Sequence, residues 1–315
     1  MSAPAIEARA RQLAKNSADN RAGSKAVNDI AHWLAALRLH ILSSEPALLA
    51  MFDLYAAEAR FGRHFIEEDL RALRVGSAIL EVGAGALLLS TQLVREGYAV
   101  TALEPTGHGF GHFARLRGRV LEYSKAQACC PVLLEIEAEQ LDSRLGFDLC
   151  FSINVMEHVS AVERVIERVT GSLKPGASYH FTCPNYLFPY EPHFNIPTLF
   201  CKAWTERLFS RRISTHPALD DPAGLWRSLN WITVTQVRRT VRRDPALRVR
   251  FQRSLLVRML ARAASDAQFS ARRSTWLVAL LRGLHFLQLH RLAAFIPATL
   301  QPVMDCRITR ITPPN

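Results

Sequence analysis

The stretch AILEVGAGALLLS, residues 78–90, decides the fold. An apolar run that ends at Val82 has the length of a strand, two glycines follow it, and an apolar-rich stretch closed by Gly97 has the pattern of a helix. A strand, a glycine turn and a helix start leave backbone N–H groups open to a ligand. The stretch therefore predicts a cofactor-binding turn.

Strand-like and helix-like segments alternate from Ala78 to Cys183, which predicts a parallel sheet covered on both faces. The expected strands are Ile79–Val82, Ala99–Leu103, Val132–Ile136, Phe147–Ile153 and Ser178–Thr182. The expected helices are Leu88–Glu96, Phe110–Arg117 and Val162–Leu173, the last ended by a turn at Leu173–Gly176.

Helical patterns dominate on both sides of this core. Residues 1–21 are polar and are expected to be frayed, and helical periodicity runs from Lys25 to Arg74. A proline- and aromatic-rich loop covers residues 184–197. The segments expected after it are helices Thr198–Phe209, Thr233–Arg243 and Phe251–Leu300, and short strands Ala246–Phe251 and Arg307–Ile311.

The distribution of charge separates the chain into two parts. Residues 1–200 hold 19 Lys and Arg against 22 Asp and Glu, whereas residues 201–315 hold 20 against 6. The basic part predicts an anionic partner, such as a membrane surface, a phosphorylated substrate, nucleic acid or an acidic protein face. The alternative is a solvated, arginine-rich surface.

The N-terminal residues and the cysteines bear on the cellular compartment. The first 28 residues are polar and charged, with no apolar signal sequence, and the six cysteines form no C-x-x-C pair. Both observations predict a reduced, cytoplasmic protein.

The motif Glu81-Val82-Gly83-Ala84-Gly85 resembles motif I of the class I S-adenosylmethionine-dependent methyltransferases, and the resemblance extends from Ile79 to Thr182. Residues 147–159 resemble motif IV of that family. The resemblance implies an α/β fold: a doubly wound, mostly parallel, Rossmann-like sheet of seven strands with a helical N-terminal cap and a helical C-terminal insertion. A nicotinamide-binding Rossmann domain is the competing interpretation, but its G-x-G-x-x-G pattern would need a glycine at Leu88.

The resemblance also implies which residues hold S-adenosylmethionine. The glycine turn passes close to the methionine part of the cofactor, because a Cβ would obstruct it. An acid after the second strand bonds the ribose hydroxyls, and an acidic segment after the third strand lies beside the adenine. Leu87 departs from the family, where a third glycine is common. The implied cofactor residues are Glu81, Gly83, Ala84, Gly85, Glu104, Glu137, Ala138 and Asn154.

The catalytic prediction rests on His158, which follows the fourth strand beside the expected methyl donor. A general base assists methyl transfer to a hydroxyl. The alternative role for His158 is a cap for a helix at Ser160–Gly171. Tyr186, Tyr190, Glu191 and His193 are expected to line the acceptor side, or else to belong to a proline-pinned loop packed on the sheet. Tyr55, Glu58 and Arg63 lie on a helix that could fold over the cofactor.

A metal site is the second interpretation of residues 154–158. Ubiquinone-pathway O-methyltransferases and small-RNA 2′-O-methyltransferases carry E-x-x-E-H here and bind a divalent metal. This chain has Asn154 in place of the first acid. Glu157, His158 and His193 are the conceivable ligands, and Glu157 is alternatively a hydrogen-bonded end of the strand. The prediction assigns no metal.

These features predict an S-adenosylmethionine-dependent methyltransferase that acts on an oxygen of a small molecule, a glycan or a lipid-linked intermediate, with nitrogen and carbon as lower-ranked acceptor atoms. We expect a helical cap over residues 1–75, a cofactor-binding core over 76–183, acceptor-side elements over 184–245, and a basic amphipathic insertion with the final strand over 246–315. Residues 246–300 are expected to dock on an anionic membrane surface, which would place the protein on the inner face of the membrane.

Two other classes of function compete with this one. A nucleic-acid (RNA) methyltransferase or binding protein would use arginines with Trp204, Trp226, Trp231 and Trp276 for phosphate contact and stacking. It ranks lower because the arginines alternate with apolar residues at helical spacing. A non-catalytic cofactor-binding protein is the third class.

Overall fold

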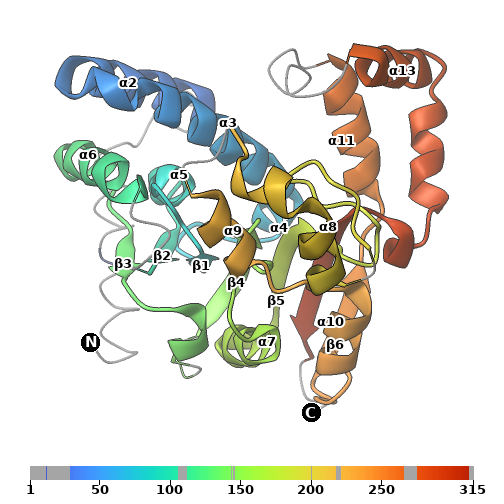
Figure 1. The fold of residues 1–315 in the computed structure, drawn as a ribbon. Coiled ribbons are helices and arrows are strands. Elements are labelled where there is room, and N and C mark those ends of the chain that lie inside the picture. Colours follow the sequence, from blue (N-terminus) through green and yellow to red (C-terminus); the bar gives the residue numbers. More distant parts are fainter. Residues whose placement is uncertain are drawn as a thin grey trace.

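Seven strands form one sheet in the computed structural model, in the order β3-β2-β1-β4-β5-β7-β6 (Figure 1). The structure describes residues 12, 29–105, 112–142, 144, 146–199, 201–217, 221–265 and 275–311. The strands are β1 (Ala78–Val82), β2 (Ala99–Leu103), β3 (Val132–Leu134), β4 (Phe147–Ile153), β5 (Leu173–Pro184), β6 (Leu247–Phe251) and β7 (Val303–Arg310). The strand β7 pairs antiparallel with both β5 and β6, and the other strand pairs of the sheet are parallel. This confirms the doubly wound, mostly parallel sheet.

Helices cover both faces of this sheet. As a result, β1 and β2 are buried at every position. One apolar core joins the sheet to four helices on one face: α2 (Ile30–Ser44), α3 (Leu49–Phe65), α5 (Leu88–Arg95) and α6 (His112–Ala126). The other core joins the opposite face to α7 (Val162–Gly171) and α10 (Val234–Val241). The cofactor-binding turn therefore lies at the carboxyl edge of a sheet fixed from both sides.

The helical N-terminal cap is confirmed. Asp29 begins α2 by accepting a hydrogen bond from the Ala31 N–H, and Pro46 opens a 3-10 turn, η2 (Pro46–Leu48), that leads into α3. The short helix α4 (Glu67–Arg71) follows. A Cβ on Gly62 would lie 2.5 Å from Ile153 Cδ1, so α3 packs closely over the end of β4.

Several predicted boundaries within the core differ from the structure. The strand β5 begins at Leu173, which pairs with Phe147, and a register shift with Gly176 in the left-handed region separates this pair from the main ladder. The strand β3 ends two residues early, and α6 continues nine residues beyond Arg117. Residues 1–21, except Gln12, lie outside the described part of the chain.

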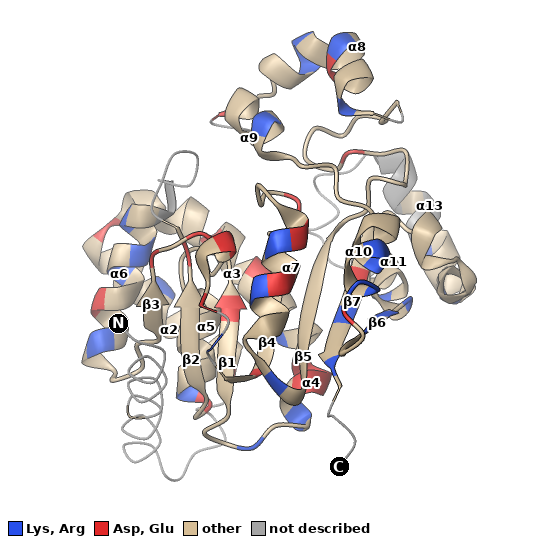
Figure 2. Ribbon diagram, turned by 90° about the horizontal axis from the view of Figure 1, so that it is seen from below, with Lys and Arg blue, Asp and Glu red and all other residues tan. Residues whose placement is uncertain are grey.

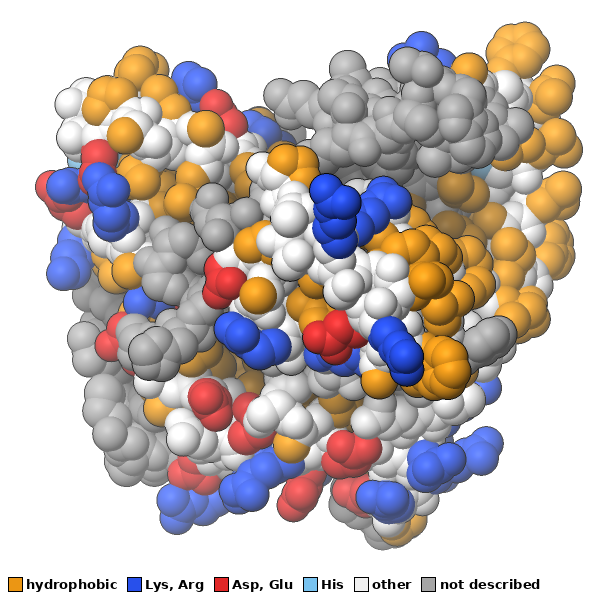
Figure 3. Space-filling view, in the orientation of Figure 1, with side chains coloured by type: hydrophobic (Ala, Val, Ile, Leu, Met, Phe, Trp, Pro, Cys, Tyr) orange, Lys and Arg blue, Asp and Glu red, His pale blue; other side chains and the backbone are white. Residues whose placement is uncertain are grey.

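The C-terminal insertion lies between β6 and β7. The single helical stretch expected over residues 251–300 is divided, since Gln288 has a φ of 59° and a 3-10 helix follows it. Its elements are α11 (Ser254–Ser265), α13 (Thr275–Phe286), η4 (Leu289–Phe295) and η5 (Ala298–Leu300). Figure 3 shows hydrophobic side chains along the edge formed by this insertion.

Two helices on the acceptor side complete the fold: α8 (Lys202–Ser214) and α9 (Pro222–Ser228). Figure 2 shows basic residues on α8, α10 and the β6–β7 edge. Across the described residues, no helix is both long and apolar enough to cross a bilayer.

Candidate active site

The glycine turn after β1 has the backbone shape that the sequence predicts. Gly83 and Gly85 have φ values of 73° and 50°, a region that glycine adopts without strain. The N–H groups of Gly83 and Ala84 donate to the Leu103 carbonyl at 2.8 and 3.1 Å. A Cβ on Gly83 would lie 2.3 Å from Val155 Cγ2, so any side chain there would collide with Val155, in the turn after β4.

Two buried acids flank this turn. The Gly85 N–H donates to Glu104 Oε2 at 2.8 Å, which places the Glu104 carboxylate against the turn. Burial raises the pKa of Glu104. The Ser90 hydroxyl donates to Glu81, whose pKa burial raises to about 8, with the nearby Glu104 charge adding to the shift. Both acids therefore lie beside the glycine turn.

Leu87, at the position of the family's third glycine, has a φ of 65°. The residue is fully buried, in the apolar core that contains α2, α3 and α5. Its backbone therefore takes the shape that glycine favours, while its side chain fills the core.

The other predicted cofactor residues follow β3 and β4. Glu137 is exposed and caps the 3-10 helix η3 (Ala138–Gln140), and Ala138 is buried beside it. Asn154 is exposed, has a φ of 54°, and donates its N–H to the Thr182 carbonyl. All of these residues lie at the carboxyl edge of the sheet, where ligands bind in open α/β folds.

Glu157 and His158 lie in the turn after β4. Both carboxylate oxygens of Glu157 are buried, and within the described part of the chain neither has a hydrogen-bond donor. Burial raises the pKa of Glu157 to about 7, and the charges of Glu191 and Glu58 add to the shift. The interpretation of Glu157 as a hydrogen-bonded end of the strand is therefore wrong for its side chain.

The ring of His158 is held by Ser228, whose Oγ lies 2.8 Å from Nδ1. Its Nε2 lies 4.0 Å from Glu157 Oε1. Burial lowers the pKa of His158 to about 3, so the ring is neutral at pH 7. His158 does not cap α7, because the Glu139 carboxylate accepts the first N–H groups there, from Ser160 and Ala161.

The acceptor-side loop brings a second histidine to the same place. The ring centroids of His193 and His158 are 5.5 Å apart. His193 Nδ1 lies 2.6 Å from Oε1 of the fully buried Glu191. Burial opposes protonation of His193, but the Glu191 hydrogen bond and the charges of Glu191, Glu157 and Glu58 outweigh it, so its pKa is raised. Ligand atoms of Glu157, His158 and His193 lie within 4.8 Å of one another.

The two predicted tyrosines differ in position. Tyr186 is buried, stacks on Trp231 and donates its hydroxyl to Glu191 Oε1 at 3.3 Å, so it holds the Glu191 carboxylate in place. Tyr190 donates its hydroxyl to Asn195 within its own loop and is partly exposed.

Three supporting residues have weak or no sequence signals. Asn230 donates to the carbonyls of Met156 and Val159, which fixes the turn that carries Glu157, and Ser228 orients His158. Neither belongs to a motif. Glu58 lies on the cap helix α3, and its charge acts on Glu157 and His193, so this helix lies near the cluster. Arg63, on the same helix, pairs with Glu96 instead.

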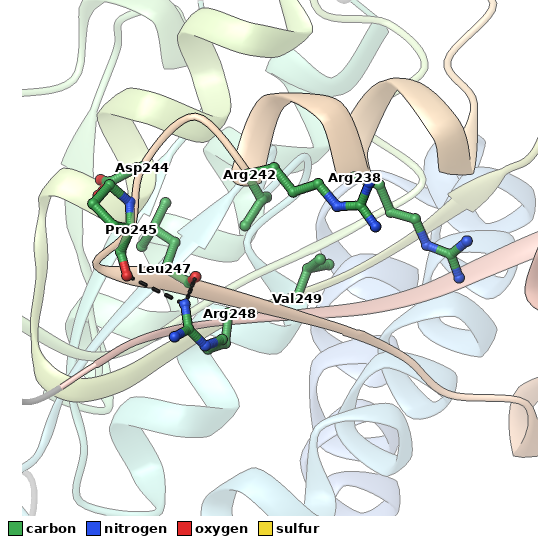
Figure 4. A pocket seen from close by; sticks show the side chains of 8 residues that line it. Arg238, Arg242, Asp244, Pro245, Leu247, Arg248 and Val249 are labelled. Atoms are coloured by element: carbon green, nitrogen blue, oxygen red, sulfur yellow. Dashed lines mark hydrogen bonds between the residues drawn. The ribbon is translucent and has the colours of Figure 1, made fainter.

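A separate surface hollow lies between α10 and β6 (Figure 4) and shares no residue with the cluster. Arg238 lies over the Phe251 ring, and Arg248 donates to the carbonyls of Pro245 and Leu247. Charged side chains beside an edge strand oppose pairing with another chain. Part of the arginine excess is therefore explained by protection of β6.

A family model described as a methyltransferase domain matches residues 80–179, which span the glycine turn, the acids and the Glu157–His158 turn. Residues 80–179 therefore form a methyltransferase domain of the class I S-adenosylmethionine-dependent type. S-adenosylmethionine is accordingly its cofactor. The site fits this group, since a turn with two left-handed glycines, which carry no Cβ, contacts a buried acid after β2.

Relatives of this methyltransferase fall into two groups. The uncharacterized protein Rv1509 of Mycobacterium tuberculosis is 51% identical over 278 residues, covering 88% of this chain and 94% of that protein. A ubiquinone biosynthesis O-methyltransferase of Paramagnetospirillum magneticum is 36% identical over 135 residues, covering 42% of this chain and 49% of its own. Among solved structures, a putative sarcosine dimethylglycine methyltransferase from Galdieria sulphuraria has a TM-score of 0.46 at 15% identity, covering 83% of this chain and 88% of its own.

Proposed function

We propose that this methyltransferase transfers the methyl group to an oxygen of a small molecule, a glycan or a lipid-linked acceptor. The observation that carries the proposal is the partly buried cluster of Glu157, His158, His193 and Glu191, formed by the turn after β4 and the acceptor-side loop. An oxygen nucleophile must lose a proton on methylation, and this cluster offers acceptors for it. The partial identity with ubiquinone biosynthesis O-methyltransferases supports the same reaction class.

The geometry favours His193 over His158 as the base. Glu191 holds His193 through Nδ1, which leaves Nε2 as the nitrogen that accepts a proton, and the surrounding acids stabilise the protonated ring. His158, whose pKa is about 3, is a weak base, and we assign it to positioning the acceptor. When bound, the cofactor supplies a methyl group activated by its sulfonium. The protein then aligns the acceptor for in-line displacement.

The cofactor roles follow the resemblance. Glu104 would bond the ribose hydroxyls, Glu81 and the backbone of Gly83–Gly85 would hold the methionine part, and Glu137 and Ala138 would lie beside the adenine. Asn154 would border the same groove from the end of β4.

A divalent cation in the cluster is the second candidate. The specific observation in its favour is the pair of buried Glu157 oxygens without a donor, because a buried carboxylate needs a cationic or hydrogen-bonding partner. Glu157, His158 and His193 would hold the ion, which would lower the pKa of an acceptor hydroxyl bound to it. Titration with Mn²⁺ tests this: the wild type should bind and Glu157→Gln should not.

The proposed function is tested by cofactor binding and then by labelling. Isothermal titration with S-adenosylhomocysteine should show binding that Glu104→Ala weakens and that Glu122→Ala, an exposed acid on α6, leaves intact. Substitution of Gly83 is a poor test, because its Cβ would collide with Val155.

Transfer of radiolabelled methyl groups into lipid, glycan and RNA fractions of a cell extract then separates the classes. Label in the lipid, glycan or small-molecule fraction, lost in His193→Gln, supports the proposal. Label in RNA alone would favour the nucleic-acid alternative, and binding without any transfer would favour a non-catalytic role.

A further inference from the structure

The segment Phe286–Leu300, called the apolar arm below, carries its large hydrophobic side chains on the outside. Phe286 and Phe295 are 84% and 77% exposed. The inward positions instead hold His290, Ala293 and, just beyond the arm, Gln301, all of which are buried. The other exposed members of the arm are Leu287, Leu289, Leu292, Ile296 and Leu300. A soluble surface rarely gathers this many apolar side chains in one segment without a partner.

Buried polar groups fix the arm in this orientation. Gln301 donates from Nε2 to the Ile296 carbonyl at 3.0 Å. Asn185, itself fully buried, donates from Nδ2 to the carbonyls of Thr299 and Gln301 at 3.2 and 2.9 Å. Since these bonds satisfy the inner backbone, the outward side chains cannot turn inward without breaking them.

Further apolar side chains are exposed on α8, over which Figure 3 shows hydrophobic groups as it does along the arm. Trp204 and Leu208 on α8 are 66% and 65% exposed, and Leu187 on the acceptor-side loop is also exposed. In the described part of the chain, the large exposed hydrophobic residues before this loop are Leu39, Leu42 and Val75.

Charge decides which partner fits this surface. Residues 275–300 contain no Asp or Glu but include Arg282 and Arg291. The helix α8 sets Lys202 and three arginines, at 207, 211 and 212, against one glutamate. A second copy docked by two-fold symmetry would bring these like charges together. Exposed Phe, Trp and Leu beside arginine instead match the interface of an anionic bilayer.

We propose that the apolar arm and α8 dock on an anionic lipid surface and present the acceptor-side loop to it. The loop and the arm share one anchor, because Asn185 starts the loop and its backbone N–H donates to the Pro302 carbonyl at 2.9 Å. Docking therefore sets the acceptor side at the lipid surface, and the acceptor class is a hydroxyl carried by a bilayer lipid. This last step rests on the proposed function.

Flotation of the full chain with vesicles tests the docking. The wild type should float with phosphatidylcholine–phosphatidylglycerol vesicles and not with phosphatidylcholine alone. The double variant Phe286→Ser/Phe295→Ser should lose about tenfold or more in partitioning, because two aromatic anchors are removed. The matched control is Leu39→Ser/Leu42→Ser, which removes two exposed leucines from α2 and should partition as the wild type does.

The charge contribution is tested on α8. Arg207→Gln/Arg211→Gln should weaken partitioning roughly fivefold for each arginine removed. Circular dichroism and S-adenosylhomocysteine binding verify that each variant is folded. Quenching of Trp204 fluorescence by brominated lipid, absent in Trp204→Phe, should locate α8 at the interface.

The results separate the two proposals. Failure of the wild type to float, or a dimer in light scattering that Phe286→Ser/Phe295→Ser converts to a monomer, would overturn the docking. Flotation without methyl transfer to any lipid would uphold the docking and refute the lipid acceptor. Intact cofactor binding without flotation would leave the methyltransferase assignment unaffected.

Discussion

Glu81 couples a proton to folding at the scale of a single residue. Its folded pKa is about 8 against an ordinary value of 4.5, because it is buried. The folded protein holds this proton more tightly than the unfolded chain does. The free energy of unfolding should therefore decrease as the pH rises from about 5 to 8, by at most about 1.4 kcal/mol per pH unit.

The variant Glu81→Gln keeps the shape of the protonated acid and removes its titration. Urea unfolding of the cofactor-free protein at several pH values should show a flatter pH dependence in the variant than in the wild type. Parallel slopes for the two proteins would contradict the assignment of the buried proton to Glu81.

Leu87 stores backbone strain beside the cofactor-binding turn. A left-handed φ costs a side-chain-bearing residue about 1–2 kcal/mol. Leu87→Ala keeps this strain and loses core packing, at about 2–5 kcal/mol, whereas Leu87→Gly loses the packing but relieves the strain. We expect Leu87→Gly to be the more stable variant by about 1 kcal/mol in urea unfolding. Greater stability of Leu87→Ala would rule out strain at this position.

His193 is the residue on which the proposed chemistry depends. His193→Gln should reduce methyl transfer about 100-fold or more while S-adenosylhomocysteine affinity is kept, because the base contacts the acceptor and not the cofactor. Glu191→Gln should reduce transfer less and shift its pH profile, since Glu191 stabilises the protonated ring. Loss of cofactor binding in His193→Gln would show that the residue has a structural role instead.

The sequence singled out Glu157, His158, Glu191 and His193, which the structure brings together, but not how each is partnered. Glu137 and Glu139 are equivalent in the motif, yet one caps η3 and the other caps α7. No sequence pattern indicated that the Glu157 carboxylate would be buried without a hydrogen-bond donor. Such differences depend on side chains brought from distant elements, as Ser228 and Asn230 are, and no local pattern encodes them.

At the scale of elements, His180 ties α4 to β5 and β7. Its Nδ1 and Nε2 lie 2.7 and 2.8 Å from carboxylate oxygens of Asp69 and Asp305, and Arg307 pairs with Asp69. Burial opposes protonation, but the hydrogen bonds with the two aspartates outweigh it, so the pKa of His180 is raised. Its contribution to stability is therefore present below the ordinary histidine pKa and lost as pH rises through the raised one.

Substitution of this histidine should be costly, because it removes the shared partner of two buried aspartates and leaves them with Arg307 and Arg258. We expect His180→Leu to lose about 3–5 kcal/mol in urea unfolding. His64→Leu, at an exposed position on α3, is the control and should change stability little. Equal stability of the two variants would mean that the network contributes nothing to the junction of α4, β5 and β7.

Helices and strands were predictable where their burial gives a clear pattern of apolar residues in the sequence. The strands β2 and β4 match the expected bounds because their apolar runs are short and bounded by polar residues. The divided helical stretch after Phe251 was not, because exposed and buried apolar side chains look alike in sequence. Nothing local distinguishes Phe295, on the surface, from Leu255, in the core.

The whole molecule carries its charge asymmetrically, and this asymmetry has a measurable consequence. Raising salt from about 0.1 to 1 M shortens the screening length from about 10 to 3 Å. Vesicle association of the wild type should therefore weaken strongly, whereas S-adenosylhomocysteine affinity, set by buried groups, should change little. Flotation and isothermal titration in the same salt series verify this, and salt-insensitive flotation would assign the docking to apolar contacts alone.

The pairing of β6 with β7 determines where the C-terminal insertion lies in the topology of the sheet. Phe251 pairs with Cys306, and the Gln252 N–H donates to the Asp305 carbonyl, so the two ends of the insertion meet at one rung of the ladder. Everything between them is, in topology, the loop of a β-hairpin. Loop closure depends only weakly on loop length. Evolution can therefore lengthen, shorten or replace this segment, and retarget the enzyme, without changing any strand pairing of the catalytic sheet.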